Sequence, residues 1–416
     1  MTETTLRVNA ARLMSDVRRL GAIGADPGGG MTRLAFTADD VAGRAYVTRL
    51  MEDAGLTVEV DAAGNLIGRR EGRNGDAPAL VLGSHIDTVI QGGAYDGAYG
   101  VLAGIEVART LAEEGIALDH PLAVVAFCNE EGARGTMGMW GSHAFAGVLP
   151  PGAAHQVDEH GVTIADLLRS VGGDADLLDG AAWTPGSIAA YFELHVEQGG
   201  VLESLDVPIG VVESIIGRVN VSVTVEGVAG HAGTTPMEQR VDALVAAARL
   251  IEAVRSIAAE ERLVLRATAG TITVDPGMWN VIPGRVRLGV EFRDASTVNM
   301  DLATDRLVGI ARRVEQDSGV RVTVEAGART EPVGCEPELQ ELIAKAAAEH
   351  GYLSHHLPSG AGHDAQIVAR IAPIGMIFVP SAGGVSHAPT EYTAPHHLAQ
   401  GADVLLSAVL KKDKIS

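Results

Sequence analysis

The sequence ALVLGSH at residues 79–85 is an apolar run of strand length that ends on a histidine. Similar runs end at or shortly before polar, ligand-forming side chains within residues 122–131, 189–195 and 374–387. Near-continuous apolar strands of this kind are typical of a sheet that is buried on both faces. Because ligands bind at the carboxyl ends of the strands in open α/β sheets, we expect the polar groups after these runs to meet at one edge.

Helical patterns alternate with strands through the first half of the chain, and the same alternation returns after Pro332. This order argues for an α/β catalytic domain with a mixed, mostly parallel sheet. The expected helices lie at 1–20, 38–54, 100–114 and 336–350, and further strands lie near 57–60, 65–69 and 374–379.

The pattern changes at residues 217–227, GRVNVSVTVEG, where apolar and polar residues alternate strictly, as in a sheet with one wet face. A helix at 238–258, expected to begin near Pro236, opens a β-α-β-β-α-β order, which is that of a ferredoxin-like α+β domain. The remaining strands of this domain are expected at 264–274, 285–293 and 320–326, and its second helix at 299–317. We therefore predict a metal-binding catalytic domain at 1–215 plus 330–416, with a domain at 216–329 inserted into it.

The composition limits the class of protein. The chain has 416 residues, more than one ordinary domain, and its apolar fraction of 46% is enough for a core. A net charge of −21 disfavours nucleic acid or an anionic membrane as a partner. No stretch approaches the ~20 apolar residues of a membrane span, and no signal peptide is apparent. Cys128 and Cys335 lie far apart and indicate no disulfide framework, so we expect a cytoplasmic protein.

Five side chains near the expected strand ends are candidate metal ligands. Imidazole and carboxylate groups suit borderline divalent ions such as zinc, manganese, cobalt or nickel. Five ligands with one shared carboxylate fit a pair of ions, which is a recurrent hydrolytic arrangement. The candidates are His85, Asp96, Glu131, His195 and His387.

Glu130, directly before Glu131, is the candidate general base. Two adjacent carboxylates repel one another when they are buried without a cation. With cations present, one carboxylate can bind metal while its neighbour takes a proton from water. Asp87 lies two residues after His85 and can hydrogen-bond the second ring nitrogen of that histidine, as metal-binding histidines usually require.

Taken singly, each of these residues has an ordinary alternative. Asp96 can be a solvated turn residue before a glycine, and the paired glutamates can belong to a solvated loop. His195 can be a core histidine, and His387 a solvated loop residue. The prediction of a metal site therefore depends on their shared position at strand ends.

Three residues of the inserted domain are candidates for substrate binding. His231 lies in GHAGTTP at 230–236, between a strand and an expected helix start, where it can donate to a developing oxyanion. Asn280 lies in a turn-rich segment. Arg293 ends a strand, where its guanidinium can pair with a substrate carboxylate. A helix cap, a turn residue and a surface ion pair are the respective alternatives.

Nine linked motifs run through nearly the whole chain. They are GSHIDTV (83–89), GGAYDGAYGVLAG (92–104), NEEGAR (129–134), ELHVEQGGVLE (193–203), GHAGTTPM (230–237), NVIPG (280–284), FRD (292–294), SGAGHDA (359–365) and FVPSAGGVSHAPTE (378–391). In these motifs and in their order, the chain resembles the di-metal aminoacylase and carboxypeptidase-like amidohydrolases. Within them, it is most similar to the branch of N-carbamoyl-L-amino-acid hydrolases, β-ureidopropionases and allantoate amidohydrolases.

The resemblance implies that Asp96 bridges two divalent ions. One ion would also bind His85 and His195, and the other Glu131 and His387. Glu130 would be the general base and acid, and we count Asp87 with it among the catalytic residues. Gly360 opens the Gly-rich loop that contains His363, and that histidine is expected to position neighbouring groups rather than bind metal. The implied substrate-binding residues are Gln198, His231, Asn280, Arg293 and Gly360, with Arg293 on the substrate carboxylate.

In this branch the inserted domain makes a homodimer, so His231 and Asn280 are expected to reach the partner's active site while the domain closes as a lid. The implied reaction is hydrolysis of the linear amide of an N-carbamoyl-L-amino acid to the amino acid, ammonia and carbon dioxide. The sequence departs from the family pattern at 135–140 and 276–279, which leaves allantoate or an N-acyl amino acid as alternative substrates. A non-catalytic binding protein on the same scaffold is disfavoured because all five ligands and Glu130 are present.

Overall fold

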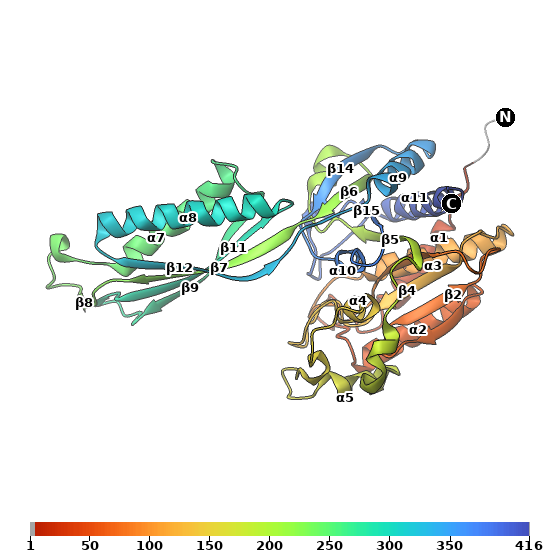
Figure 1. Cartoon of the computed structure of the whole chain (residues 1–416), viewed down its shortest axis with the longest axis horizontal. Helices are drawn as coiled ribbons and strands as arrows, with labels where there is room; N and C mark the ends of the chain where they lie inside the picture. Colours follow the sequence, from red (N-terminus) through yellow and green to blue (C-terminus); the bar gives the residue numbers. More distant parts are fainter. Residues whose placement is uncertain (1–4, 416) are drawn as a thin grey trace. The chain divides into compact units, whose positions relative to one another are not determined.

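The computed structural model describes residues 5–415 (Figure 1). Contacts between residues divide the chain into two units, of which the second is Ser214–Gly334 and the first is the chain on either side of it. Residues 1–4 of the helix predicted at 1–20 lie outside the described part. The rest of that prediction is too long at its start, because helix α1 begins at Ala10, after the side chain of Asn9 caps the N–H of Arg12.

The first unit is built around a nine-stranded sheet with the strand order β1-β2-β4-β3-β5-β15-β6-β13, and β14 pairs with β6. The four central strands β4, β3, β5 and β15 are parallel, and the flanking strands are antiparallel. The predicted α/β fold with a mostly parallel central sheet is therefore confirmed. The strands are β1 Thr57–Val60, β2 Leu66–Arg70, β3 Ala79–His85, β4 Leu122–Phe127, β5 Ile188–Val196, β6 Ile209–Ile215, β13 Val333–Gly334, β14 Ser354–Ser359 and β15 Ile374–Val379.

The register of the central strands aligns their carboxyl ends. His85 of β3 lies beside Phe127 of β4, and His195 of β5 lies beside Phe378 of β15. Residues 190, 192, 194 and 196 of β5 lie in the apolar cluster under the helices. Because side chains alternate along a strand, His195 points to the opposite face of the sheet. The last side chains of neighbouring strands therefore lie close together at the carboxyl edge of the sheet.

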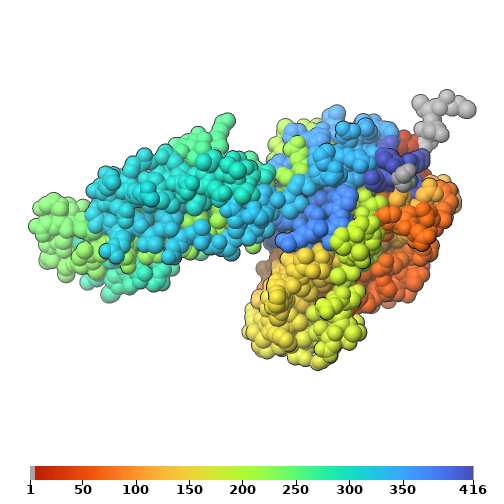
Figure 2. All heavy atoms as spheres, in the orientation of Figure 1, coloured from red at the N-terminus to blue at the C-terminus, as the bar shows by residue number. Residues whose placement is uncertain are grey.

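Five helices cover one face of this sheet through a single apolar cluster, and the terminal helices α1 and α11 lie side by side among them (Figure 1). Helix α3 is buried along most of its length, which explains its lack of a polar face. Two short helices, α4 Trp140–Phe145 and α10 Asp364–Val368, contact the other face. Figure 2 shows the segment around residues 150–180, in yellow, gathered at one side of the first unit. The five covering helices are α1 Ala10–Leu20, α2 Ala38–Asp53, α3 Ala98–Glu113, α9 Pro337–Glu349 and α11 Pro395–Lys412.

The second unit has a four-stranded antiparallel sheet in the order β12-β7-β11-β9, with helices α7 and α8 packed on one face (Figure 1). The strict alternation of β7 buries every second side chain against these helices and leaves the other face open to solvent. A two-stranded ribbon of β8 Gly230–His231 and β10 Val281–Ile282 accompanies it. The main elements are β7 Gly217–Glu226, α7 Ala243–Ala259, β9 Arg266–Asp275, β11 Arg285–Asp294, α8 Thr297–Ser318 and β12 Arg321–Thr330.

The predicted start of the helix after Pro236 was wrong. That proline precedes a single 3₁₀ turn, Met237–Gln239, and helix α7 begins at Ala243. The side chain of Asp242 accepts the N–H groups of Leu244 and Val245, which satisfies two donors that a helix start leaves free. The capping carboxylate thus decides the boundary. Within residues 5–415, no helix combines the length and the apolar character that crossing a membrane requires.

Replacing Phe292 with alanine should lower the free energy of unfolding of the second unit by about 3–5 kcal/mol. Phe292 is fully buried in β11 among the residues that join the sheet to α7 and α8, so its removal leaves a cavity. Urea unfolding followed by circular dichroism measures the change. Ser222→Ala, at an exposed position of β7, is the control and should change this free energy by less than about 0.5 kcal/mol. Equal effects of the two substitutions would contradict the assigned core.

Candidate metal centre

Four parallel strands and one turn bring the predicted ligands together. His85 is the last residue of β3, and His195 is the last but one of β5. Glu131 follows β4, and His387 lies in the loop after β15. Asp96 stands two residues before helix α3. The structure thus assembles all five predicted ligands at the carboxyl edge of the central sheet.

Asp96 lies between two groups of ligands. Its Oδ1 atom is 3.1 Å from Nε2 of His195 and 3.7 Å from Nε2 of His85. Its Oδ2 atom is 2.9 Å from Nε2 of His387, which in turn lies 3.5 Å from Oε1 of Glu131. In each group, His85–Asp96–His195 and Asp96–Glu131–His387, the ligand atoms lie within 4.8 Å of one another. The two carboxylate oxygens of Asp96 therefore face different groups.

The two buried histidines present the same ring nitrogen to this cluster. Nδ1 of His85 is 3.0 Å from the backbone oxygen of Asp87, and Nδ1 of His195 is 2.8 Å from the backbone oxygen of Val196. A carbonyl oxygen only accepts, so each Nδ1 carries the proton that makes this hydrogen bond. Nε2 of both rings is thereby directed at Asp96, as a metal ligand must be.

The predicted role of Asp87 needs a correction. Its backbone oxygen, not its carboxylate, hydrogen-bonds His85; the nearest carboxylate oxygen is 3.9 Å from Nδ1. The carboxylate instead accepts the backbone N–H groups of Glu130 and Glu131, each at 3.1 Å. The peptide carbonyl of Asp87 serves the ring, and its side chain binds the segment that follows β4. Asp87 therefore fixes the segment that carries both glutamates.

A buried glutamate and two glycines hold Asp96 in place. Oε1 of Glu391 accepts the N–H groups of Tyr95 and Asp96 at 3.0 and 3.2 Å. A Cβ atom on Gly93 would lie 2.0 Å from Glu391, and one on Gly97 would lie 2.4 Å from the His85 ring. The glycines of this turn therefore permit a close approach of the backbone that a side chain would prevent. Glu391 was not predicted, although it ends one of the motifs.

Gln198, a predicted substrate-binding residue, lies within the same cluster. Its Nε2 atom donates to Oδ2 of Asp96 at 2.9 Å and lies 3.3 Å from both Oγ of Ser386 and Nε2 of His387. Ser386 also donates to Glu391 at 2.7 Å. The amide is thus directed at the ligands Asp96 and His387.

Burial gives the carboxyl groups unusual acidities. It raises the pKa of Glu130 well above its ordinary value, and the neighbouring carboxyls of Asp364 and Glu131 add to the shift. Burial, together with the smaller effect of the negative charge of Asp96, raises the pKa of Glu131 to about 8. The pKa of Asp96 would also rise with burial, but hydrogen bonds from His195 and His387 hold it well below its ordinary value. The raised pKa values of Glu130 and Glu131 show that negative charge is in excess around them, whereas the histidines stabilise the charge of Asp96.

Three further buried residues lie against the cluster. Oε1 and Oε2 of Glu193 accept from Oγ of Ser84 and the N–H of Ala365, at 3.0 and 2.8 Å. The ring of His363 lies edge-on to His195, and its Nε2 is 2.8 Å from Oγ of Ser359, so its predicted role beside the metal ligands is compatible with this packing. Asp364 begins helix α10 and is fully buried. Glu193 was missed, although its spacing of two from His195 on one strand places both on the same face.

The predicted residues of the second unit lie in two places. His231 is the second residue of β8, and helix α7 begins at Ala243, so the helix start that was expected near Pro236 does not lie close to His231. Its Nδ1 accepts the N–H groups of Gly233 and Thr234 at 3.0 and 3.2 Å, and the backbone oxygen of Asn280 accepts from Ala232. Arg293 lies on β11 and pairs with Glu291 at 2.6 Å. Gly360, in the first unit, has no neighbouring atom within 4 Å of an added Cβ, so crowding does not require a glycine there.

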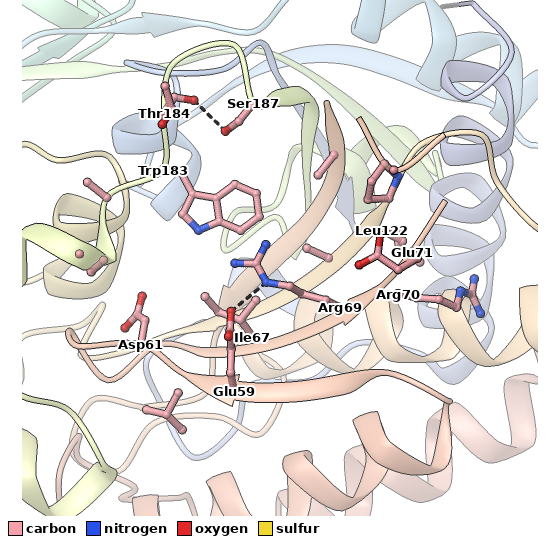
Figure 3. A pocket seen from close by; sticks show the side chains of 18 of the residues that line it. Glu59, Asp61, Ile67, Arg69, Arg70, Glu71, Leu122, Trp183, Thr184 and Ser187 are labelled. Atoms are coloured by element: carbon pink, nitrogen blue, oxygen red, sulfur yellow. Dashed lines mark hydrogen bonds and ion pairs between the residues drawn. The ribbon is translucent and has the colours of Figure 1, made fainter. Parts of the chain in front are cut away.

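A cavity of about 580 Å³ lies elsewhere in the first unit (Figure 3). The guanidinium of Arg69 lies 4.4 Å from the ring centre of Trp183 and pairs with Glu59 at 2.8 Å. Ala79 and Leu122, the first residues of β3 and β4, form part of its wall. This cavity is therefore at the opposite ends of the strands from the ligands, and it contains none of the predicted site residues.

The donor set fits a divalent metal. Imidazole nitrogens and carboxylate oxygens are suitable ligands for zinc and its neighbours, and both groups of three include each type. Buried carboxylates that raise one another's pKa values require positive charge, and the histidines supply only part of it. The residues present therefore satisfy the chemical requirement for metal binding.

The sequence model of peptidase family M20/M25/M40 matches residues 81–411. The chain belongs to this family. An N-carbamoyl-L-amino acid amidohydrolase of Geobacillus stearothermophilus is 43% identical, over 97% of this chain and 98% of its own length. An allantoate amidohydrolase of Bacillus subtilis is 38% identical, over 94% and 95%. The crystal structure of an amidase of the hydantoinase/carbamoylase family from Burkholderia multivorans has a TM-score of 0.92 at 38% identity, covering 98% of this chain and 99% of that one.

Divalent metal should bind this M20 family member more tightly as the pH rises from 7 to 9. In the metal-free protein, hydrogen bonding to Asp96 raises the pKa of His387 to about 9 and, against the effect of burial, that of His195 to about 9. Glu131, with a pKa of about 8, also holds a proton at neutral pH. Metal ligands must lose these protons, so binding releases them and lower pH opposes it.

Titration calorimetry in buffers with different ionisation enthalpies measures this proton release. His387→Ala should release roughly one proton fewer and bind metal more weakly. An affinity that stays constant between pH 7 and 9 would show that the metal does not displace these protons.

Proposed function

We propose that this protein hydrolyses the linear amide C–N bond of an N-carbamoyl-L-amino acid to give the amino acid, ammonia and carbon dioxide. The observation that carries this proposal is the position of Asp96 between two groups of ligands, with Glu130 beside them. Oε2 of Glu130 lies 3.7 Å from Nε2 of His85. The names of two relatives support the choice of amide, since one is an amidohydrolase of N-carbamoyl-L-amino acids and the other an amidohydrolase of allantoate.

The proposed cofactor is a pair of divalent ions, zinc, manganese, cobalt or nickel. His85, Asp96 and His195 would hold one ion, and Asp96, Glu131 and His387 the other, with Asp96 shared. When bound, such ions polarise a carbonyl group and make water a stronger acid. The position of His85 and His195 among the last residues of two adjacent parallel strands favours a preformed site.

Glu130 is the proposed general base and acid. Asp87 holds its backbone N–H, which places the main chain of Glu130 beside the ligand cluster. It would take a proton from the attacking water and then deliver it to the leaving nitrogen. Burial raises the pKa of Glu130 and thereby favours its protonated form, which suits the carboxyl to carry that proton to the nitrogen.

The second unit, with the boundaries 216–329 predicted from the sequence, is proposed as the lid and dimerisation domain. His231 is suited to stabilise an oxyanion, because its Nδ1 accepts two backbone N–H groups and the proton therefore lies on Nε2. Arg293 would bind the substrate carboxylate, exchanging part of its contact with Glu291 for it. Asn280, Gln198 and Gly360 complete the proposed substrate site.

A second copy of the chain is the proposed partner. Strand β9 is an edge of the second unit's sheet, and its residues 267–274 include no charged side chain. Edge strands that do not pair are usually protected by charge or proline, so β9 is suited to pair with another chain. The opposite edge, β12, carries Arg321, Glu325 and Arg329. In the proposed homodimer, His231 and Asn280 enter the active site of the partner.

The substrate side chain is the least constrained part of the proposal. Trp279, in a segment that departs from the family pattern, is fully exposed, whereas Met139 has a left-handed backbone with a φ of 53° and contacts Gly362. Allantoate or an N-acyl amino acid therefore remains the alternative substrate. A panel of carbamoyl, acyl and allantoate compounds, each tested with the four ions, decides among them. Released ammonia indicates a carbamoyl or allantoate substrate, and a released organic acid indicates an acyl substrate.

Replacing Glu130 with glutamine should reduce kcat by about 10²- to 10⁴-fold, because the general base is lost while the side chain keeps its shape. Metal content, measured by mass spectrometry, should remain that of the unchanged protein. Ser222→Ala, on the open face of the second unit, is the control and should retain full kcat. If Glu130→Gln retains full activity, the proposed base is wrong; if no compound of the panel is hydrolysed by the metal-loaded protein, the function is wrong.

Mixing the inactive variants Glu130→Gln and His231→Ala should restore about a quarter of the wild-type activity, since half of the randomly formed dimers are mixed and each has one complete site. The reason is that one chain then provides Glu130 and its partner provides His231. Subunit exchange is verified by native mass spectrometry. Each variant treated in the same way without the other is the control. Mixed dimers that form but remain inactive would place His231 in the site of its own chain.

A further inference from the structure

Arg33 is a fully buried arginine. It connects the N-terminal part of the chain to the segment that follows His85 at the end of β3 and includes Asp87. Its Nε atom donates to the backbone oxygen of Ile86 at 2.8 Å. The backbone of Arg33 also pairs with Thr88, giving its N–H to Oγ1 of Thr88 at 2.8 Å and accepting the N–H of Thr88 at 3.0 Å. Both ends of the segment 86–88 are therefore attached to one residue.

The other side of the guanidinium is anchored far from the site. Its Nη1 atom donates to the backbone oxygens of Leu20 and Ile23 at 2.9 and 2.8 Å. These carbonyls lie at the end of helix α1 and in the turn after it. The side chain thus connects a helix of the covering layer to the carboxyl end of β3.

The burial of this charged arginine is energetically unfavourable. Burial lowers the pKa of Arg33 to about 10, so the guanidinium remains charged at neutral pH. Its Nη2 atom has no hydrogen-bond partner among the described residues. A buried charge with an unpaired donor destabilises a fold. The acidic groups that face it are Asp40 and Asp87, both buried.

A short chain of contacts leads from Arg33 to the reacting groups. Arg33 holds the peptide of Ile86, the next residue is Asp87, and the carboxylate of Asp87 accepts the N–H groups of Glu130 and Glu131. We propose that Arg33 is a positioning residue that sets the place of the segment 86–88 and, through Asp87, aims Glu130 and Glu131. The kinetic part of this inference depends on the proposed function; the structural part does not.

Arg109 provides a matched comparison. It is also a buried arginine of the first unit, paired with Asp16 at 2.7 Å and donating to the backbone oxygen of Leu50 at 3.3 Å. None of these partners belongs to the metal centre. A substitution at Arg109 therefore reports the general effect of removing a buried guanidinium from this layer.

The test compares Arg33→Met, Arg33→Lys and Arg109→Met in the full-length protein. Hydrogen–deuterium exchange of the metal-stripped protein is followed in peptides that cover 86–88 and 130–131. Arg33→Met should lose protection in these peptides beyond the rest of the first unit, and Arg109→Met should not. With metal and substrate, Arg33→Met should lower kcat by roughly 10²-fold with little change in KM, because a misplaced base slows the chemical step.

Arg33→Lys keeps the charge and most of the volume but loses the second arm of the guanidinium. It should recover part of the protection and of kcat, and it serves as the test if Arg33→Met does not fold. The positioning role would be overturned if protection fell evenly over the first unit. It would also be overturned if both Arg33 variants had the same kcat as Arg109→Met. If the local loss of protection occurs but no carbamoyl compound is hydrolysed, the proposed function fails while the positioning role stands.

Discussion

The carboxylate of Asp96 is the interaction on which the ligand cluster depends. Its two oxygens face different sets of ligands, so a shift of this one side chain would separate both sets. The backbone around it is fixed from outside, since Glu391 accepts two N–H groups of the turn. Gly97, with a φ of 61°, lets the chain pass directly over the ring of His85. Few other residues could therefore replace the glycines of this turn.

The excess of buried acid explains why the site requires cations. Asp87, Asp96, Glu130, Glu193 and Asp364 are all buried near the cluster. Burial raises the pKa of Asp364 well above its ordinary value, and Glu193 adds to the effect, so part of this charge is neutralised by protons in the metal-free protein. Divalent ions can replace those protons, which couples metal binding to the stability of the site.

Much of the fold and the convergence of the ligands followed from the sequence for a simple reason. Parallel strands end at a common edge, so an apolar run followed by a polar residue locates that residue in space as well as in the chain. The contacts that position the ligands were less accessible. Arg33 and Glu391 act through backbone N–H and C=O groups of distant segments, and a sequence pattern carries no record of such partners. The orientation of Asp87 was mistaken for the same reason, because a peptide carbonyl competed with its side chain for His85.

The charge of the first unit argues for a contribution from the second. Within the described residues of the first unit, the side-chain partners of the five ligands are acidic, imidazole, amide or hydroxyl groups, and no ion pair joins a ligand to a Lys or Arg side chain. Arg33 lies behind the strand end, fully buried, and cannot reach a substrate carboxylate. A substrate that carries its own negative charge would be repelled by the acidic edge unless a cationic group accompanied it. Arg293, half-buried on β11 beside Glu291, is the residue of the second unit that we propose for that task.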